Sequence, residues 1–159
     1  MSVALFPGSF DPFHNGHLEV VDRAVRHFDQ VIVAVIRNPQ KAEPLFSAAE
    51  REEMINESVG HHGNVRTVSM STLVVDVAIE VGADVIVKGL RAVSDFENEL
   101  QMAQMNRQLS GIDTLFIPTG SSHSFIASRL IREIARYGGD VSSFVPDPVV
   151  RRMKGRPDE

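Results

Sequence analysis

Two histidines lie three residues apart in the segment 7-PGSFDPFHNGH-17, between a short apolar run and an amphipathic pattern. Pro7–Gly8 predicts a turn, and Gly16 allows a close approach of the backbone. His17 is expected in the first turn of the following helix, where free N–H groups and the helix dipole attract anions. Ser9 adds a hydroxyl and a backbone N–H. A single histidine would favour a plain capping loop, but His-x-Gly-His at this joint favours phosphate chemistry.

Cations follow two later apolar runs. Lys88 and Arg91 bracket Gly89 at the end of one run, where a glycine lets backbone N–H groups face a ligand. A proline-containing loop after an earlier run carries Lys41, which alone would be interpreted as a solvated side chain. Glu99 follows on the next helix, as an ion-pair partner or as part of a solvated face. Each signal is weak alone, and their shared position predicts a polyphosphate site.

A serine-rich segment, 119-TGSSHSF-125, leads into a helix predicted over Phe125–Tyr137. The N-terminus of that helix is a second place where free N–H groups could bind phosphate. In the alternative interpretation, Ser124 or Ser128 is only the helix cap, and Arg129 only decorates the helix surface.

The elements that must position these residues follow from the hydrophobic pattern. Short apolar runs bounded by turn residues predict strands buried on both faces of a parallel sheet, over Val3–Phe6, Val31–Ile36, Val65–Val68, Val85–Lys88 and Leu115–Ile117. Amphipathic stretches predict helices over Leu18–Phe28, Ser47–Val59, Leu73–Val81, Asp95–Leu109, Phe125–Tyr137 and Pro148–Lys154. Met102–Met105 is interpreted as helix packing.

This alternation predicts a doubly wound α/β fold, with a five-stranded parallel sheet and helices on both faces. The length of 159 residues suits a single domain over 1–159, with a flexible tail at 154–159. Ligands in such folds bind beyond the carboxyl ends of the strands. The loops described above leave those ends, so we expect them to share one site.

Composition excludes several classes of function. The chain contains no cysteine, which excludes disulfides, thiolate zinc sites and cysteine nucleophiles. A net charge of −5 argues against a nucleic-acid partner. No apolar stretch suits a membrane span or a signal peptide, so a soluble cytoplasmic protein is expected.

The sequence contains no P-loop motif, no dinucleotide-binding Gly-x-Gly-x-x-Gly motif and no His-Glu-x-x-His motif. His14 and His17 have no evident third metal ligand, and His61-His62 is interpreted as a polar surface turn.

Several segments together resemble the bacterial phosphopantetheine adenylyltransferase family, from about Val3 to about Pro148. They are PGSFDP at 7–12, NGH at 15–17, KGLR at 88–91, DFE at 95–97 and QMAQMN at 101–106. His-x-Gly-His alone marks only the wider nucleotidyltransferase superfamily. The resemblance implies a Rossmann-like enzyme that transfers the adenylyl group of ATP to 4′-phosphopantetheine. The products are dephospho-coenzyme A and pyrophosphate, in the penultimate step of coenzyme A synthesis.

The resemblance also implies roles for individual residues. His17, Lys41 and Arg91 would be catalytic, and His17 would stabilise the transition state. Phosphopantetheine would contact Ser9, Lys41, Val74 and Lys88. ATP would contact Ser9, Phe10, His17, Gly89, Leu90, Arg91, Glu99, His123, Ser124, Phe125, Ile126, Ala127, Ser128 and Arg129. Magnesium would be held mainly by the ligand phosphates, with no protein metal ligand, and the family typically forms a homohexamer.

Three positions depart from the family pattern. His14 stands where many members have threonine, so no catalytic role is assigned to it. Lys88 stands where arginine is common, which keeps the charge but loses the bidentate fork. Ala127-Ser128-Arg129 replaces a serine-rich helix start, which leaves the backbone N–H groups as the contacts to phosphate.

The implied chemistry explains why no acid–base pair is found. A phosphate monoester is already a nucleophile near neutral pH, so in-line attack on the α-phosphorus needs positioning and charge stabilisation. Lys41 and Lys88 would offset the repulsion between two anionic substrates, and Arg91 would hold the polyphosphate.

Three alternatives stay open. Another nucleotidyltransferase of the superfamily could use nicotinamide mononucleotide or a polyol phosphate as its acceptor. A class I aminoacyl-tRNA synthetase fragment shares His-x-Gly-His, but this chain lacks Lys-Met-Ser-Lys-Ser and is too short and acidic for tRNA. A non-catalytic adenine-nucleotide sensor would bind ATP without releasing pyrophosphate.

Overall fold

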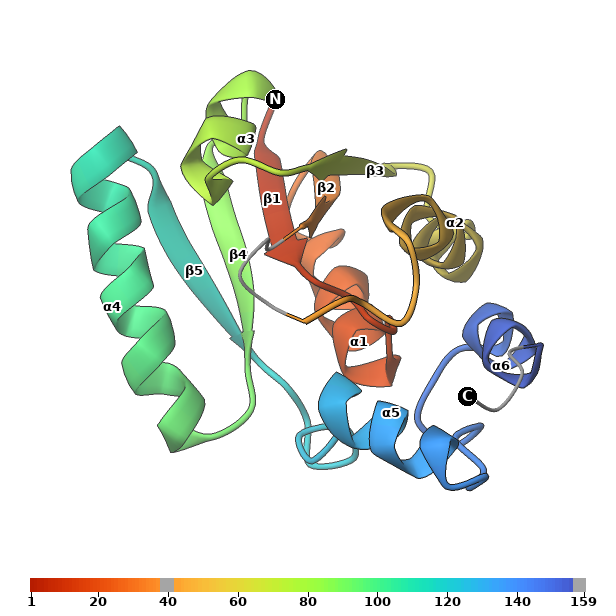
Figure 1. The fold of residues 1–159 in the computed structure, drawn as a ribbon. Coiled ribbons are helices and arrows are strands. Elements are labelled where there is room, and N and C mark those ends of the chain that lie inside the picture. The colour runs from red at the N-terminus through yellow and green to blue at the C-terminus, as the bar shows by residue number, and fades with distance from the viewer. Residues whose placement is uncertain (38–41, 156–159) are drawn as a thin grey trace.

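The computed structural model describes residues 1–37 and 42–155, in which strands and helices alternate as predicted (Figure 1). The elements are β1 (Val3–Gly8), α1 (Asn15–Ala24), β2 (Gln30–Ile36), α2 (Ala48–Val59), β3 (Val65–Met70), α3 (Val74–Glu80), β4 (Val85–Leu90), α4 (Val93–Ser110), β5 (Asp113–Pro118), α5 (Ser128–Arg136) and α6 (Asp147–Lys154). No helix in this part of the chain is long and apolar enough to cross a membrane.

The five strands form one parallel sheet in the order β3-β2-β1-β4-β5. The direction of winding reverses between β1 and β4, which is the topological switch point where such sheets bind ligands. β1 pairs with β2 along its whole length, whereas it pairs with β4 only at Ala4–Val85 and Leu5–Ile86. The carboxyl ends of β1 and β4 therefore separate. The predicted doubly wound fold is confirmed.

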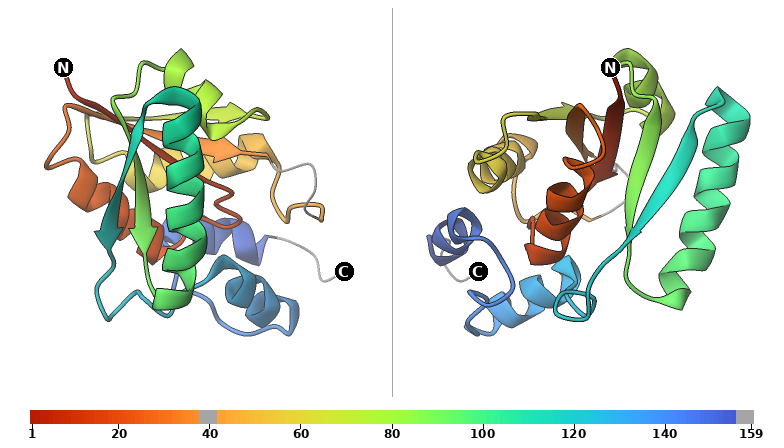
Figure 2. Two further views of the ribbon diagram at one scale, coloured as in Figure 1. Left: turned by 90° about the vertical axis from the view of Figure 1, so that its left-hand side faces the viewer. Right: turned by 180° about the vertical axis from the view of Figure 1, so that it is seen from behind.

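Helices cover both faces of the sheet, as Figures 1 and 2 show. Alternate residues of β1 point to opposite faces, so Ala4 and Phe6 join one core cluster while Val3 and Leu5 join the other. The first cluster packs against residues of α1, α2, α5 and α6, and the second packs against α3. The helix α4 lies against β5 and α3. The helix α1 thus stands directly over the diverging strands β1 and β4.

Two helix boundaries differ from the prediction. The first helix was expected to reach Phe28, but α1 ends at Ala24 and a turn follows. The helix expected from Phe125 begins only at Ser128, because residues 121–125 form turns. In those turns the N–H groups of His123 and Ser124 donate to the carbonyl of Gly120 at 3.0 Å each, which closes the loop before the helix.

A capping box opens α2 at Ser47, where the helix was predicted to begin. Glu50 N donates to Ser47 Oγ at 3.2 Å, and Ser47 N donates to Glu50 Oε2 at 2.7 Å. These reciprocal bonds satisfy two backbone donors at the start of the helix. The local sequence therefore suffices to define this boundary.

The helix α4 leaves an apolar stripe uncovered. Met102, Met105 and Leu109 are 58%, 61% and 64% exposed, and their spacing places them along one side of the helix. The interpretation of Met102–Met105 as helix packing is wrong for both Met102 and Met105, which are exposed.

Candidate active site

The loop after β1 lies at the switch point of the sheet, and distant segments hold it in place. Arg51 Nη1 donates to the carbonyl of Ser9 at 2.7 Å. The buried Asp11 carboxylate accepts the backbone N–H groups of Leu45 and Phe46 at 2.8 and 2.9 Å. These charge-assisted bonds link the first and second loops. The backbone that carries Ser9 is therefore fixed before any ligand arrives.

Phe10 forms the wall behind the catalytic candidate His17. Its backbone has a φ of 50°, and a Cβ on Gly8 would lie only 2.8 Å from the Phe10 ring. Gly8 is thus required by this close approach. The Phe10 ring centroid lies 4.9 Å from that of His17, in an edge-to-face contact. Because the ring is buried, the predicted ATP contact of Phe10 would use its backbone.

The two histidines cap α1 reciprocally. His14 is the N-cap, and its Nδ1 accepts the N–H groups of Gly16 and His17 at 3.0 and 3.4 Å. In return, His17 Nδ1 accepts the N–H of His14 at 3.1 Å. This is the geometry of a capping box built from imidazoles. The rings stack with centroids 3.6 Å apart. No pattern in the sequence indicated this role for His14.

The cap also fixes the protonation of both imidazoles. Burial, together with the charges of Arg91 and His123, lowers the pKa of His14 to about 3. Burial also holds the pKa of His17 well below its usual value, with contributions from His14, Lys88 and Arg91. Each ring is therefore neutral at pH 7. Since Nδ1 accepts, the proton of each neutral ring lies on Nε2, which makes His17 a hydrogen-bond donor.

The predicted cations stand at the end of β4 with acidic partners. Lys88 Nζ lies 3.6 Å from Glu99 Oε2, and Arg91 Nε lies 3.2 Å from Asp95 Oδ2. The charges of Lys88 and Arg91 both contribute to the lowered pKa of His17. Because β1 and β4 are parallel neighbours in the sheet, the first and third loops leave the same edge, as predicted.

Gly89 is also required for packing, in addition to the role toward a ligand that the sequence predicts. A Cβ at Gly89 would lie 2.9 Å from Val20 Cγ2 on α1. The glycine is therefore required because α1 packs directly on β4. This contact places the middle of α1 on the last part of β4, where the following Leu90 accepts the N–H of Thr119 at 3.0 Å.

Glu19 anchors the fourth loop to α1. Its carboxylate accepts the N–H of Gly120 at 2.9 Å and contacts His123 Nδ1 at 2.8 Å and Arg23 Nη2 at 2.8 Å. Burial raises the pKa of Glu19, but the bonds from His123 and Gly120 outweigh this and lower it, so the carboxylate stays ionised. Glu19 thus positions His123, a predicted ATP contact. Sequence reasoning missed Glu19, since its partners lie about a hundred residues away.

The start of α5 faces the first loop. Its N-cap is Ala127, which makes no side-chain cap bond, so the alternative of a capping Ser124 or Ser128 is wrong. Ser128 Oγ instead donates to the carbonyl of Pro12 at 2.8 Å. The carbonyl of Ile126 accepts a bond from the Arg91 guanidinium at 2.7 Å. The backbone N–H groups at this helix start are not used by a side-chain cap and remain suited to phosphate.

Three predicted residues lie apart from this centre or outside the described structure. Phe125 is on the surface, where its ring meets Phe144 edge-on at 6.4 Å, and Arg129 is exposed. Lys41 lies outside the described residues. Contacts of Phe125 and Arg129 with ATP stay predictions, as does the role of Lys41.

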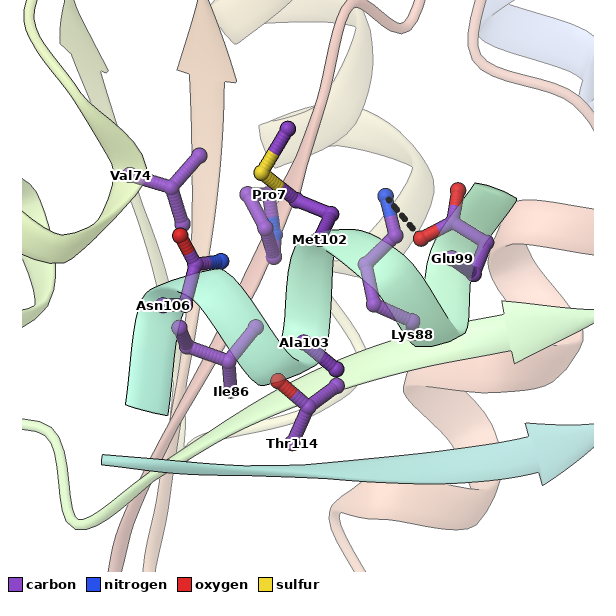
Figure 3. A pocket seen from close by; sticks show the side chains of 9 residues that line it. All are labelled: Pro7, Val74, Ile86, Lys88, Glu99, Met102, Ala103, Asn106 and Thr114. Atoms are coloured by element: carbon purple, nitrogen blue, oxygen red, sulfur yellow. Dashed lines mark ion pairs between the residues drawn. The ribbon is translucent and has the colours of Figure 1, made fainter. Parts of the chain in front are cut away.

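A small pocket of about 40 Å³ opens beside Lys88 (Figure 3). Its walls come from β1, β4, β5, α3 and α4, and are formed by Pro7, Val74, Ile86, Lys88, Glu99, Met102, Ala103, Asn106 and Thr114. Val74 and Lys88 were predicted. Met102, Ala103 and Asn106 were missed, although their spacing from Glu99 along one face of α4 was a signal. Within the described chain, the buried Thr114 Oγ1 has no hydrogen-bond partner.

Carboxylates beside the predicted cations are the side chains that could bind a divalent metal at this site. The acidic groups nearest the cations, Asp95 and Glu99, are paired with Arg91 and Lys88. Among the described residues, the group of three side chains suited to a metal lies elsewhere, at Asp22, His61 and His62. The residues around His17 therefore fit a metal carried by ligand phosphates rather than one caged by protein.

Comparisons with known proteins agree with this geometry. The cytidylyltransferase-like family model matches residues 5–134. A phosphopantetheine adenylyltransferase of Heliobacterium modesticaldum is 50% identical over 154 residues, covering 96% of this chain and 91% of the relative. That of Frankia alni is 51% identical over 160 residues, covering 98% of each chain.

A solved structure shows the same fold at low identity. The bifunctional NMN adenylyltransferase/ADP ribose pyrophosphatase from Francisella tularensis matches with a TM-score of 0.72 and 15% identity. The match covers 96% of this chain and 48% of that one. Another structure of that enzyme, complexed with AMP and a manganese ion, matches with a TM-score of 0.72 and 17% identity.

The switch-point crevice, with a His-x-Gly-His helix start on one side and cations on the other, defines a nucleotidyltransferase of the cytidylyltransferase-like class. Within that class, relatives about half identical along nearly their whole length decide the family. This chain belongs to the phosphopantetheine adenylyltransferase family, which confirms the resemblance seen in the sequence.

Proposed function

We propose that this chain transfers the adenylyl group of ATP to 4′-phosphopantetheine, giving dephospho-coenzyme A and pyrophosphate. The observation that carries the proposal is the histidine cap at the start of α1, in which His17 Nδ1 accepts and Nε2 is left as a donor, on a helix that packs against β4 beside Lys88. Family membership supplies the identity of both substrates. Release of pyrophosphate that depends on phosphopantetheine tests it.

The two substrates would occupy neighbouring parts of the crevice. The triphosphate would lie over the start of α1, between His17 and Arg91, with the start of α5 beside it. The acceptor phosphate would lie near Lys88, and its pantetheine arm would enter the pocket lined by Val74 and Asn106. That pocket holds about 40 Å³, so the arm requires α4 or its side chains to move outward. The buried Thr114 hydroxyl would then gain a polar partner.

The chain's own residues would act by position and charge. The acceptor phosphate is a nucleophile without a general base, and attack on the α-phosphorus moves negative charge onto oxygens near His17. Nε2 of His17, which carries the proton of the neutral ring, would donate a hydrogen bond to those oxygens. On binding, Arg91 would leave its ion pair with Asp95, and Lys88 its ion pair with Glu99, and both would pair with phosphate oxygens instead. Each cation therefore has an ionic partner before and after the substrate binds.

We propose magnesium as the metal. It would be held by the phosphates of ATP, and when bound it would neutralise charge on them. The relative's complex with a manganese ion supports a divalent ion in this fold class.

We also propose a homohexamer in the cytoplasm. The uncovered stripe of Met102, Met105 and Leu109 on α4 supports contact with another copy. The cytoplasmic location stays a prediction, which the absence of cysteine supports. The single-domain boundary and the tail at 154–159 also stay predictions.

Replacing Lys41 or Lys88 by alanine should mainly impair use of the acceptor. Loss of one cation beside a dianionic phosphate is expected to raise the KM for phosphopantetheine about 10- to 100-fold. The KM for ATP should change less than about threefold, since Arg91 and the helix starts remain. Steady-state kinetics with each substrate varied in turn measure the two KM values separately.

Lys154→Ala, which removes an exposed lysine at the end of α6, is the matched control. Equal loss for both substrates would contradict the assignment and indicate a folding defect.

A further inference from the structure

A second cluster of chemically capable side chains lies outside the site described above. Asp22 projects from α1, and His61 and His62 belong to the turn that follows α2. His62 Nε2 lies 2.6 Å from Asp22 Oδ1, and His61 Nε2 lies 3.5 Å from the same oxygen. All three potential ligand atoms lie within 4.8 Å of one another. The interpretation of His61-His62 as an unremarkable surface turn is therefore incomplete.

The backbone holds this cluster in shape. His62 N donates to the carbonyl of Val59 at 2.8 Å, which fixes the turn at the end of α2. Asn64 Nδ2 donates to the carbonyls of Phe28 and Val25 at 3.2 and 3.5 Å, which ties the same turn to the segment after α1. The backbone of His62 and the side chain of Asn64 make these bonds, and neither imidazole nor the Asp22 carboxylate takes part in them. Rotation of the three side chains can therefore change the distances between their ligand atoms.

The donor set and its dimensions suit a borderline transition metal. Two imidazole nitrogens and one carboxylate oxygen are typical ligands of Zn²⁺, with bonds of about 2.0–2.2 Å. Tetrahedral geometry at that length separates ligand atoms by about 3.4 Å. The Asp22–His61 distance of 3.5 Å already matches, and the Asp22–His62 distance of 2.6 Å must open by about 0.8 Å. The hard cation Mg²⁺ prefers oxygen ligands and fits this set poorly.

We propose that Asp22, His61 and His62 form a Zn²⁺ site that joins α1 to the turn between α2 and β3. The three side chains are 40%, 58% and 20% exposed, so an ion can enter from solvent and complete its coordination with water. Asp22 lies five residues after His17, about 8 Å along the helix and on a different side of it. The bound ion therefore fastens the helix that carries the catalytic candidate and takes no part in the reaction. The site does not depend on which acceptor the enzyme uses.

The test uses the full chain after removal of metal with a chelator, titrated with ZnCl₂ in a calorimeter without ATP. We expect about one ion per chain. Asp22→Asn, His61→Gln and His62→Gln should each weaken binding at least about tenfold. His27→Gln removes an exposed histidine outside the cluster and should bind like the wild type. Magnesium at millimolar concentration should not compete.

Thermal stability and histidine ¹⁵N spectra test whether the ion binds at these three side chains. Saturating Zn²⁺ should raise the Tm of the wild type, and each of the three ligand variants should lose this shift. In ¹⁵N spectra of the wild-type histidines, the signals of His61 and His62 should move on addition of Zn²⁺ while those of His14 and His17 stay unchanged. Absence of binding, equal binding by the ligand variants, or movement of His14 and His17 instead would overturn the proposal.

Discussion

His17→Ala should lower turnover by about 10²- to 10³-fold while the affinity for ATP changes less than about threefold. The reason is that the His17 donor faces charge that develops during transfer, so its bond is stronger in the transition state than in the ground state. Arg91 and the backbone N–H groups at the start of α5 remain to bind the triphosphate. Rapid-quench turnover and calorimetric ATP titration measure the two quantities separately.

Alanine also removes half of the histidine capping box, so two further variants separate catalysis from folding. His17→Glu retains an acceptor for the His14 N–H, as in common capping boxes, but it places a negative charge toward phosphate. It should fold like the wild type and be inactive. His17→Gln supplies both an acceptor and an amide donor, so it should retain more turnover than alanine. An alanine variant within tenfold of wild-type turnover would remove His17 from the mechanism.

The second large effect is expected on acid stability. The His14 imidazole is 4% exposed, and burial lowers its pKa to about 3, whereas a histidine in the unfolded chain titrates near 6.5. At a pH between these two pKa values, His14 is protonated in the unfolded chain and neutral in the folded chain. The free energy of unfolding therefore falls as the pH drops from 6.5 toward 3. Between pH 7 and pH 5 His14 alone contributes a loss of about 2 kcal/mol.

His14→Thr should remove this part of the acid sensitivity. Threonine is itself a good N-cap, so the cap at the start of α1 is retained while the buried imidazole is lost. Urea unfolding at pH 7 and pH 5 should show a smaller loss for the variant, by about 2 kcal/mol. His17, whose pKa is also lowered, remains in the variant and keeps part of the sensitivity. A variant that loses as much stability as the wild type would show that His14 is not the buried titrating group.

Much of this structure could be predicted from the sequence because the signals are local. Apolar runs and amphipathic periods gave the order of elements, and Ser47 with Glu50 marked the start of α2. The same reasoning placed His17, Lys88 and Arg91 at carboxyl ends of strands. The parallel fold then brings those ends to one edge, which is why these three residues meet.

The features that could not be predicted from the sequence depend on contacts between distant segments. Glu19 contacts Gly120 and His123, about a hundred residues away, and α5 begins only after the turns at 121–125. The role of His14 depends on the backbone entering α1 in an extended conformation, which residue types alone do not specify. The pocket face of α4, with Met102 and Asn106, is defined only when α4 lies beside β4 and β5. These are properties of the assembled fold rather than of any one segment.

The central claim is tested most directly by pyrophosphate release from ATP and magnesium, with three acceptors side by side. They are 4′-phosphopantetheine, nicotinamide mononucleotide and glycerol 3-phosphate. We predict release with phosphopantetheine alone, together with dephospho-coenzyme A detected by mass. Release with another acceptor instead would contradict the substrate while leaving the chemistry in place. ATP binding without release for any acceptor would contradict the proposed function and favour a nucleotide sensor.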